Sequence, residues 1–178
     1  TEMNKRFNLM KGGPAAALEN FRRFGLRIYG TFIFGYDSNG PESFDTAVHF
    51  AKDQGLFIAA FNHITPFPGT PLYDRLRREG RLLYESWWLD ERYRYNMVPF
   101  QPARMTPEEL EARCLEARRA FYLWPSILKR FASPVNRSNA FMAANFLAIN
   151  AMHQRDVDGR SGLNLGDASW PGPYLPVN

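Results

Sequence analysis

Apolar positions in the first third of the chain predict a helix followed by a buried strand. The helix is expected from Pro14 to Phe24, because proline suits the first helical position and Gly25 suits the stop. The next segment, Arg27 to Phe34, is almost continuously apolar and rich in β-branched and aromatic residues, which is typical of a strand covered on both faces. The helix is expected to bury four apolar residues: Ala17, Leu18, Phe21 and Phe24.

A second helix, a second strand and a third helix follow. The second helix is expected to open at Pro41-Glu42, and its apolar positions fall at i, i+3, i+4 and i+7, which forms one stripe. The run from Leu56 to Ile64 predicts the second strand. Thr70 is expected to cap a third helix that begins at Pro71 and ends at Gly80. The stripe of the second helix consists of Phe44, Ala47, Val48 and Ala51.

The order of these elements predicts a parallel pair of strands. Connections that contain whole helices favour a right-handed βαβ crossover. Two parallel strands have unpaired backbone groups on both edges, so this segment is expected to belong to a larger α/β barrel or doubly wound sheet. We therefore expect a missing part upstream of Thr1.

Composition changes after Gly80, where an aromatic, loop-like stretch runs from Tyr84 to Phe100. We expect a domain edge here, with residues 1–83 on one side and an aromatic linker with a helical extension, residues 84–178, on the other. Thr106-Pro107-Glu108-Glu109 is a capping box with proline at the first helical position. Further helices are expected at Ser126–Phe131 and Ala140–His153, followed from Asp156 by an irregular tail.

The composition is that of an ordinary folded protein, with 178 residues, 45% apolar and 15% aromatic. No run approaches the roughly 20 apolar residues that cross a bilayer, and no leader pattern is visible, so a cytoplasmic location is expected. The single cysteine, Cys114, excludes an intrachain disulfide and a thiolate cluster built from this chain alone. Its place on a predicted helix face favours core packing over a nucleophilic role.

The charged residues give no strong indication of a nucleic-acid partner. The net charge is +4, but the 22 basic and 18 acidic residues are interleaved, which is typical of a solvated surface. Binding to nucleic acid would require one basic face, and the sequence does not show one. The basic residues considered for such a face are Arg22, Arg23, Arg27, Lys129 and Arg130.

Candidate binding residues lie where the two strands end, since ligands of parallel α/β folds sit at the carboxyl ends of the strands. Alternatives remain for each group: Gly35 can serve only the turn, Pro66 can shape only the loop, and His63 can be a structural histidine. Acidic pairs such as Asp37/Glu42 are not distinguished by spacing from caps and solvated charges. The candidates are Thr31, Ile33, Gly35 and Asp37 after the first strand, and Asn62, His63, Thr65 and Pro66 after the second.

Several segments together resemble one family. The run Tyr29 to Asp37 and the run Asn62 to Tyr73, which contains Thr65-Pro66-Phe67-Pro68-Gly69, are similar to radical S-adenosylmethionine enzymes of the type that often carry an upstream cobalamin-binding domain. Asn4 to Phe7, Trp87-Trp88 and Arg92 to Tyr95 extend the resemblance, which covers most of the chain.

The resemblance implies a fold of the α/β class: the C-terminal portion of a partial, TIM-like (β/α) barrel followed by a helical extension. It implies S-adenosylmethionine as cofactor, a 4Fe-4S cluster whose cysteine ligands are absent from this chain and lie upstream, and possible use of cobalamin. The substrate is expected to be a small molecule that is modified by a radical or methylated. The upstream, cluster-binding half of the same polypeptide is the expected partner, and the segment alone is expected to be inactive.

In the family, the strand similar to Thr31–Gly35 lies against adenine and carries the pattern Gly-x-Ile-x-Gly-x-x-Glu. This chain keeps Ile33 and Gly35, but has Thr31 in place of the first glycine and Ser38 in place of the glutamate, with Asp37 one step earlier. The resemblance therefore implies that an apolar seat for adenine is retained and leaves the acidic contact open.

A hypothesis from another class is a non-catalytic interaction module. Clustered Trp and Tyr residues between Tyr84 and Phe100 suit an interface hot spot, so this segment could dock a partner domain.

Overall fold

The computed structural model describes residues 13–163, in which two parallel strands are combined with six helices. Strand β1 (Tyr29–Phe34) pairs with β2 (Ile58–His63) in the register Tyr29 to Ile58 through Phe34 to His63. Helix α2 (Glu42–Asp53) connects them. The parallel pair and the α/β class predicted from the sequence are confirmed, whereas the partial, TIM-like (β/α) barrel stays a prediction.

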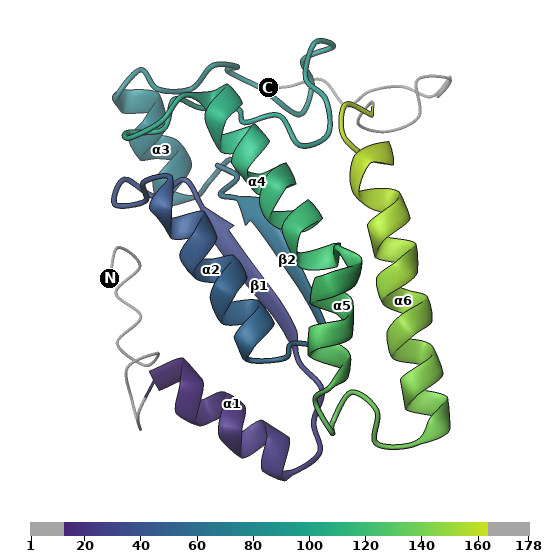
Figure 1. Cartoon of the computed structure of the whole chain (residues 1–178). Coiled ribbons are helices and arrows are strands. Elements are labelled where there is room, and N and C mark those ends of the chain that lie inside the picture. Colours follow the sequence, from purple (N-terminus) through teal and green to yellow (C-terminus); the bar gives the residue numbers. More distant parts are fainter. Residues whose placement is uncertain (1–12, 164–178) are drawn as a thin grey trace.

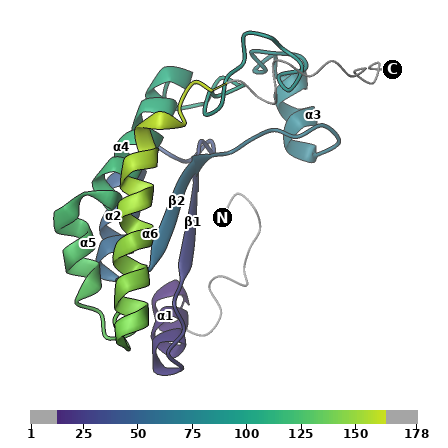
Figure 2. The ribbon, with the colours of Figure 1, turned by 90° about the vertical axis from the view of Figure 1, so that its right-hand side faces the viewer.

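The helices form a layer on one face of the strand pair (Figure 1). Helix α4 (Pro107–Tyr122) packs against β2 and α2, and α6 (Ala140–Gly159) lies along the outer side of α4. Helix α5 (Trp124–Phe131) continues from α4 near the start of β2, and α1 (Gly13–Arg23) precedes β1 at the same end. Helix α3 (Pro71–Arg78) stands apart, beyond the carboxyl ends of the strands (Figure 2).

One hydrophobic core joins the strands to α2 and α4. Phe34 stacks on Phe44 of α2 at 4.0 Å between ring centroids, and Phe61 of β2 packs on Phe121 of α4 at 5.5 Å. The apolar stripes predicted for α2 and α4 are therefore confirmed, because they face this core. The expected division into residues 1–83 and 84–178 stays a prediction, and in the described residues both parts contribute to the same core.

The prediction that β1 is covered on both faces is wrong for the described residues. Side chains alternate across a strand, and those of one face of β1 are exposed: Tyr29 by 61% and Ile33 by 45%. Figure 2 shows the reason, since the helix layer lies on one side of the strands only within residues 13–163. The nearly continuous apolar run therefore includes a face that residues 13–163 leave uncovered.

The outer edge of β2 is not unpaired, contrary to the sequence-based prediction. The Tyr122 hydroxyl donates to Ala59 O at 2.9 Å and accepts from Ala59 N at 3.2 Å. Arg118 Nε donates to Phe61 O at 2.9 Å. Side chains from α4 thus occupy the positions that another strand would need, so the sheet ends at β2.

The edge of β1 differs from that of β2. Ile28 O accepts a hydrogen bond from Phe57 N at 3.1 Å, and Phe34 O accepts one from Ile64 N at 2.7 Å. Because the polar groups of a parallel strand alternate in direction, the backbone groups of Tyr29, Thr31 and Ile33 point to the other edge. That edge is where a further strand can pair.

Helix α1 was predicted within one residue of its observed limits, but its predicted buried face is wrong. Only Leu18 is buried, whereas Phe21 is 44% and Phe24 is 80% exposed. The helix touches the main core through one residue and is held to the end of α2 by Arg22, which donates to Gln54 O at 2.7 Å.

Helices α4 and α6 begin where the sequence predicts, whereas α5 begins at Trp124, two residues before the predicted Ser126. Thr106 and Glu109 form both hydrogen bonds of the capping box, at 3.1 and 2.8 Å, and α4 starts at Pro107. Helix α6 extends beyond the prediction to Gly159, so the irregular tail expected from Asp156 begins later. An ion pair between Asp156 and Arg160 at 3.1 Å supports this last turn, as an i,i+4 pair does on a helix. The remainder of the predicted tail and the segment Asn4–Phe7 lie outside the described residues.

Candidate functional site

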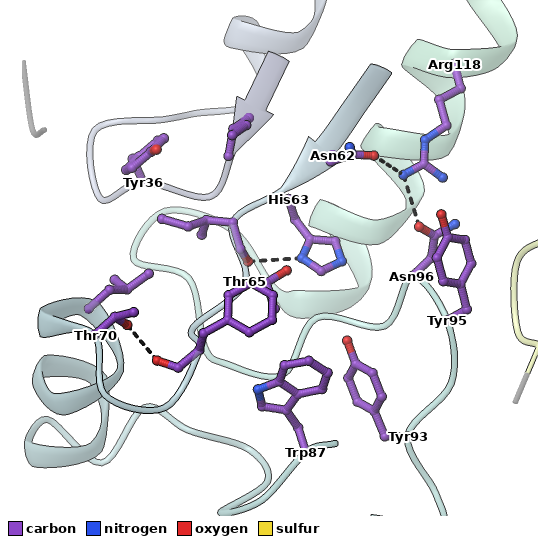
Figure 3. Close-up of a pocket in the computed structure, with 14 residues that line it drawn as sticks. Tyr36, Asn62, His63, Thr65, Thr70, Trp87, Tyr93, Tyr95, Asn96 and Arg118 are labelled. Atoms are coloured by element: carbon purple, nitrogen blue, oxygen red, sulfur yellow. Dashed lines mark hydrogen bonds between the residues drawn. The ribbon is translucent and has the colours of Figure 1, made fainter. Parts of the chain in front are cut away.

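A pocket of about 650 Å³ lies at the carboxyl ends of the two strands, between residues that follow the strands, residues of the aromatic stretch and Arg118 of α4. This is the end of a parallel sheet at which loops converge and ligands bind. Figure 3 shows side chains from the strands, the aromatic stretch and α4 directed toward the same space. The described residues that line it are Ile33, Tyr36, Asn62, His63, Ile64, Thr65, Phe67, Thr70, Leu72, Trp87, Tyr93, Tyr95, Asn96 and Arg118.

Four of the eight candidates from the sequence line this pocket: Ile33, Asn62, His63 and Thr65. The register of the strands brings them together, since Ile33 pairs with Asn62 and Phe34 with His63. The 45% exposure of Ile33 leaves an apolar surface available beside polar groups. An apolar wall with a few polar groups suits a planar heteroaromatic ligand.

Thr31 and Pro66 do not line the pocket. Thr31 is exposed on the face of β1 that has no helix layer in the described residues, three residues before the strand ends at Phe34. Pro66 is fully buried, and its carbonyl accepts a hydrogen bond from Trp87 Nε1 at 3.0 Å. Pro66 therefore positions an aromatic wall of the pocket.

Gly35 is buried and faces the core rather than the pocket. A Cβ at this position would lie 2.8 Å from Leu110 Cδ2 and 3.2 Å from Phe100 Cζ. Its φ of +94° is also one that residues with a side chain rarely adopt. A side chain here would disturb packing against α4, so Gly35 is required for the turn whatever the pocket binds.

Asp37 also lies outside the pocket, in a double ion pair that ties the loop after β1 to the α3 region. Arg75 donates to one carboxylate oxygen and Arg81 Nη2 donates to the other at 2.8 Å. Burial alone would raise the pKa of Asp37, but the hydrogen bonds from Arg81 and Arg75 outweigh it and lower this pKa below its ordinary value. The carboxylate is therefore charged and engaged at neutral pH.

Arg118 was not among the predicted site residues, yet it holds one side of the pocket together. It reaches from α4 to the end of β2, where Nη2 donates to Asn62 Oδ1 and Asn96 Oδ1, each at 3.0 Å (Figure 3). The sequence offered only a weak signal, since Arg118 is adjacent to Ala117 on the buried stripe of α4. A long side chain beside such a stripe can extend along it and present its charge at the end.

Asn96 adopts a backbone conformation that few residues tolerate, with φ of 75°. Asparagine is enriched in this left-handed region, which other residues with a side chain enter at a cost. Its amide is held by Arg118 at the pocket margin. A constrained residue of this kind at a ligand-sized pocket is consistent with a functional role.

The aromatic stretch forms a further wall of the strand-end pocket. Trp87 and Tyr93 are 9% and 6% exposed, and their rings lie 5.1 Å apart. Phe67 meets Trp87 edge-on at 5.8 Å. The rings of Trp87 and Tyr93 are buried, which favours a pocket wall over the exposed docking surface considered from the sequence. Sequence reasoning placed the aromatic segment but could not tell which way its rings point.

His63 is a neutral polar group in the pocket. Burial is the largest cause that lowers its pKa, and the charge of Arg118 acts in the same direction. Nδ1 lies 3.1 Å from Ile64 O, which orients the ring. The imidazole is therefore uncharged at neutral pH and can exchange hydrogen bonds with a ligand.

Cys114 is buried in the core, as predicted, and burial raises the pKa of its thiol to about 12. A thiol in this state is neither nucleophile nor metal ligand. Within residues 13–163, no group of three His, Cys, Asp or Glu side chains is placed to hold a metal ion. None of the helices described there combines the length and apolarity required to span a bilayer.

The sequence is similar to several curated methyltransferases. It is 29% identical over 135 residues to bacteriochlorophyllide d C-12(1)-methyltransferase and 32% identical over 113 residues to bacteriochlorophyllide d C-8(2)-methyltransferase, both of Chlorobaculum tepidum. These matches cover 75% and 64% of this chain, but 28% and 24% of the relatives. The hopanoid C-2 methylase of Rhodopseudomonas palustris is 31% identical over 47% of this chain and 16% of its own length.

The chain thus spans about a quarter of the length of the relatives that it matches over the longest stretches. No family model and no solved structure matches it. The comparisons support an enzyme related to methyltransferases.

Proposed function

We propose that the chain is the C-terminal part of a radical S-adenosylmethionine methyltransferase and that its strand-end pocket receives the adenine of S-adenosylmethionine. The observation that carries this proposal is the convergence of Ile33, Asn62 and Thr65 at one ligand-sized pocket. The names of the relatives support methyl transfer, and that reaction has S-adenosylmethionine as its usual methyl source.

The pocket fits the cofactor in its chemistry. Ile33, Ile64 and Leu72 offer apolar contact for the faces of a purine, while Asn62 and Thr65 offer hydrogen bonds to its edge. His63, being neutral, adds a donor or acceptor without opposing charge. When bound, S-adenosylmethionine would supply the methyl group or the radical; the residues of this chain would orient it and exclude water.

The same residues do not fit an iron–sulphur cluster. The chain has one cysteine, and burial keeps that thiol protonated. We therefore propose that the cluster, and cobalamin where the enzyme uses it, are held by an upstream part of a longer polypeptide. The free edge of β1 and its exposed face, with Tyr29 and Ile33, support this proposal because they suit a further parallel strand and its cover.

The substrate is proposed to be a small molecule. The relatives are named for a bacteriochlorophyllide and a hopanoid. A docking role for the aromatic segment is less well supported, because Trp87, Tyr93 and Phe100 are buried.

Turnover of S-adenosylmethionine tests the proposal. The complete polypeptide that contains this chain should, when reduced under anaerobic conditions, convert S-adenosylmethionine to S-adenosylhomocysteine or 5′-deoxyadenosine. The Asn62→Ala variant should be slower, because Asn62 lies in the pocket. An intact, reduced polypeptide that leaves the cofactor unchanged would contradict the proposed activity.

A further inference from the structure

The pocket has an electrostatic asymmetry that the binding of adenine does not explain. Arg118 is the only lining residue with a permanent charge, and no carboxylate lines the pocket among the described residues. Its three hydrogen-bond acceptors, Phe61 O, Asn62 Oδ1 and Asn96 Oδ1, are all neutral. The strand-end pocket therefore carries one positive charge with no carboxylate among its described lining residues, while Asp156 and Arg160 line a neighbouring hollow that Arg118 also lines.

Part of this guanidinium remains available. Hydrogen bonds within residues 13–163 use Nε and Nη2 of Arg118, and Nη1 has no partner there. The side chain is also not fully buried. An arginine whose other nitrogens are fixed presents a pre-oriented donor, which is a favourable arrangement for binding a carboxylate.

Room for a ligand larger than adenine lies on both sides of Arg118. A second hollow of about 310 Å³ shares Asn62, Tyr95 and Arg118 with the strand-end pocket. Arg118 therefore stands where the two hollows adjoin. The larger pocket alone, at about 650 Å³, is of a size that holds drug-sized ligands, for which the usual range is roughly 300–1,000 Å³.

The aromatic wall of the pocket, formed by Trp87, Tyr93 and Phe67, suits flat ring systems. Trp87, Tyr93 and Phe67 pack on one another and line the same space, which fixes their orientation. Aromatic faces and edges attract other ring systems in stacked or edge-on arrangements. A flexible aliphatic chain would not benefit from such preformed ring surfaces to the same degree.

We propose that the methyl acceptor is a flat, mainly apolar ring system with a carboxylate, its rings against Trp87 and Tyr93 and its carboxylate on Arg118. This inference rests on the proposed function and specifies the substrate class of the same site. S-adenosylmethionine also combines a ring with a carboxylate, so the test must separate these two sources.

The test uses two fluorescent probes of the same shape, pyrene-1-carboxylate and its neutral analogue pyrene-1-carboxamide. Each probe is titrated into the complete polypeptide that contains this chain. The carboxylate should bind the wild type more tightly than the amide, and Arg118→Gln should weaken the carboxylate by roughly 10- to 100-fold, the range expected for a charge-assisted hydrogen bond. The affinity for the amide should fall much less than that for the carboxylate, and this smaller loss measures the effect of removing the hydrogen bonds from Arg118 to Asn62 and Asn96. Arg118→Lys should recover part of the loss.

Matched variants separate charge from position. Arg155→Gln removes the same charge from an exposed site on α6 and should leave both probes unaffected. Trp87→Leu should weaken both probes to a similar extent, because it removes ring surface and no charge. Equal loss of both probes in Arg118→Gln, or equal affinity of both probes for the wild type, would overturn the inference.

The second measurement is the affinity of the same Arg118→Gln protein for labelled S-adenosylmethionine. Because Arg118 also positions Asn62, the affinity for the cofactor is expected to fall no more than the affinity for the neutral amide, while that for pyrene-1-carboxylate falls much further, which assigns the charge of Arg118 to the substrate. A loss of cofactor affinity as large as the loss for pyrene-1-carboxylate would overturn the inference, because Arg118 would then serve the cofactor's carboxylate, while the proposed function would stand.

Discussion

Individual buried polar side chains attach the helix layer to β2 and to the residues that precede it. Arg130 is 0% exposed and has no acidic partner among residues 13–163; its guanidinium donates to Leu56 O, Phe57 O and Phe121 O at 3.0 to 3.2 Å. It also lies 3.7 Å from the ring centroid of Phe121. Burial lowers the pKa of Arg130 to about 10, so it remains charged at neutral pH.

Replacement of Arg130 should therefore be costly. In Arg130→Met the buried carbonyl oxygens lose their donor, which predicts a fall of roughly 3–5 kcal/mol in the free energy of unfolding. Urea denaturation followed by circular dichroism measures it. The neighbouring Lys129→Met, which removes an exposed charge paired with Asp53, should cost less than about 1 kcal/mol. Similar stability of both variants would show that the buried contacts are not important.

Asp37 gives a prediction for pH dependence. Its pKa is lowered from 3.8 in the folded state, so its ion pairs stabilise the fold above about pH 4, and this contribution is lost as the pH falls through the lower, folded-state pKa. Asp37→Asn should lower the free energy of unfolding by about 0.5–1 kcal/mol at neutral pH. The difference from the wild type should vanish in acid; a difference that is independent of pH would contradict the ion-pair account.

At the scale of elements, helix starts were predictable because they depend on local chemistry. Thr70 and Thr106 each cap the helix that the sequence assigned to them, with the hydroxyl accepting from the backbone three residues on. The apolar periods of α2 and α4 likewise predicted which face is buried. Exposed Phe24 shows the limit: a pattern gives an apolar face but not whether a neighbour covers it.

The termination of the sheet at β2 was not predictable, because it depends on side chains more than 50 residues away from the strand. Tyr122 and Arg118 bind backbone groups of β2 over sequence separations of 63 and 57 residues. Only the fold brings α4 beside this edge. The sequence therefore predicted an unpaired edge where the structure has a closed one.

Tyr122→Phe tests this closed edge. The variant leaves the amide and carbonyl of Ala59 without their partner, which should lower the free energy of unfolding by about 1–3 kcal/mol. Hydrogen exchange at the Ala59 amide should accelerate more than at the other amides of β2. An unchanged exchange rate at Ala59 would mean that the hydroxyl does not protect the edge.

For the whole molecule, the two sheet edges and the two sheet faces have different roles. Helices cover one face and close the β2 edge, whereas the β1 edge and the face with Tyr29 and Ile33 are accessible in the described residues (Figure 2). Half of the residues that the sequence predicted for the site line the pocket, because Ile33 and Asn62 are paired near the ends of adjacent strands. Arg118 and the inward turn of Trp87 come from tertiary packing, which no local pattern specifies.

Proline substitutions distinguish the edges. The amide of Thr31 points away from β2, so Thr31→Pro should reduce the stability of this chain much less than Phe32→Pro, whose amide faces β2. In the complete polypeptide, Thr31→Pro should be as damaging as Phe32→Pro, because an upstream strand is proposed to pair there. Thermal unfolding of the four proteins measures both differences; equal tolerance of Thr31→Pro in both settings would contradict an additional strand.

The most direct test of the central claim is the affinity of the complete polypeptide for S-adenosylmethionine, measured by equilibrium dialysis with labelled cofactor. Ile33→Glu places a charge on the apolar wall of the pocket and should weaken binding at least about tenfold, whereas Ile33→Val keeps that wall apolar and should stay within about twofold of the wild type. Equal affinity of the wild type and Ile33→Glu, with both proteins folded, would contradict the assignment of this pocket to the cofactor.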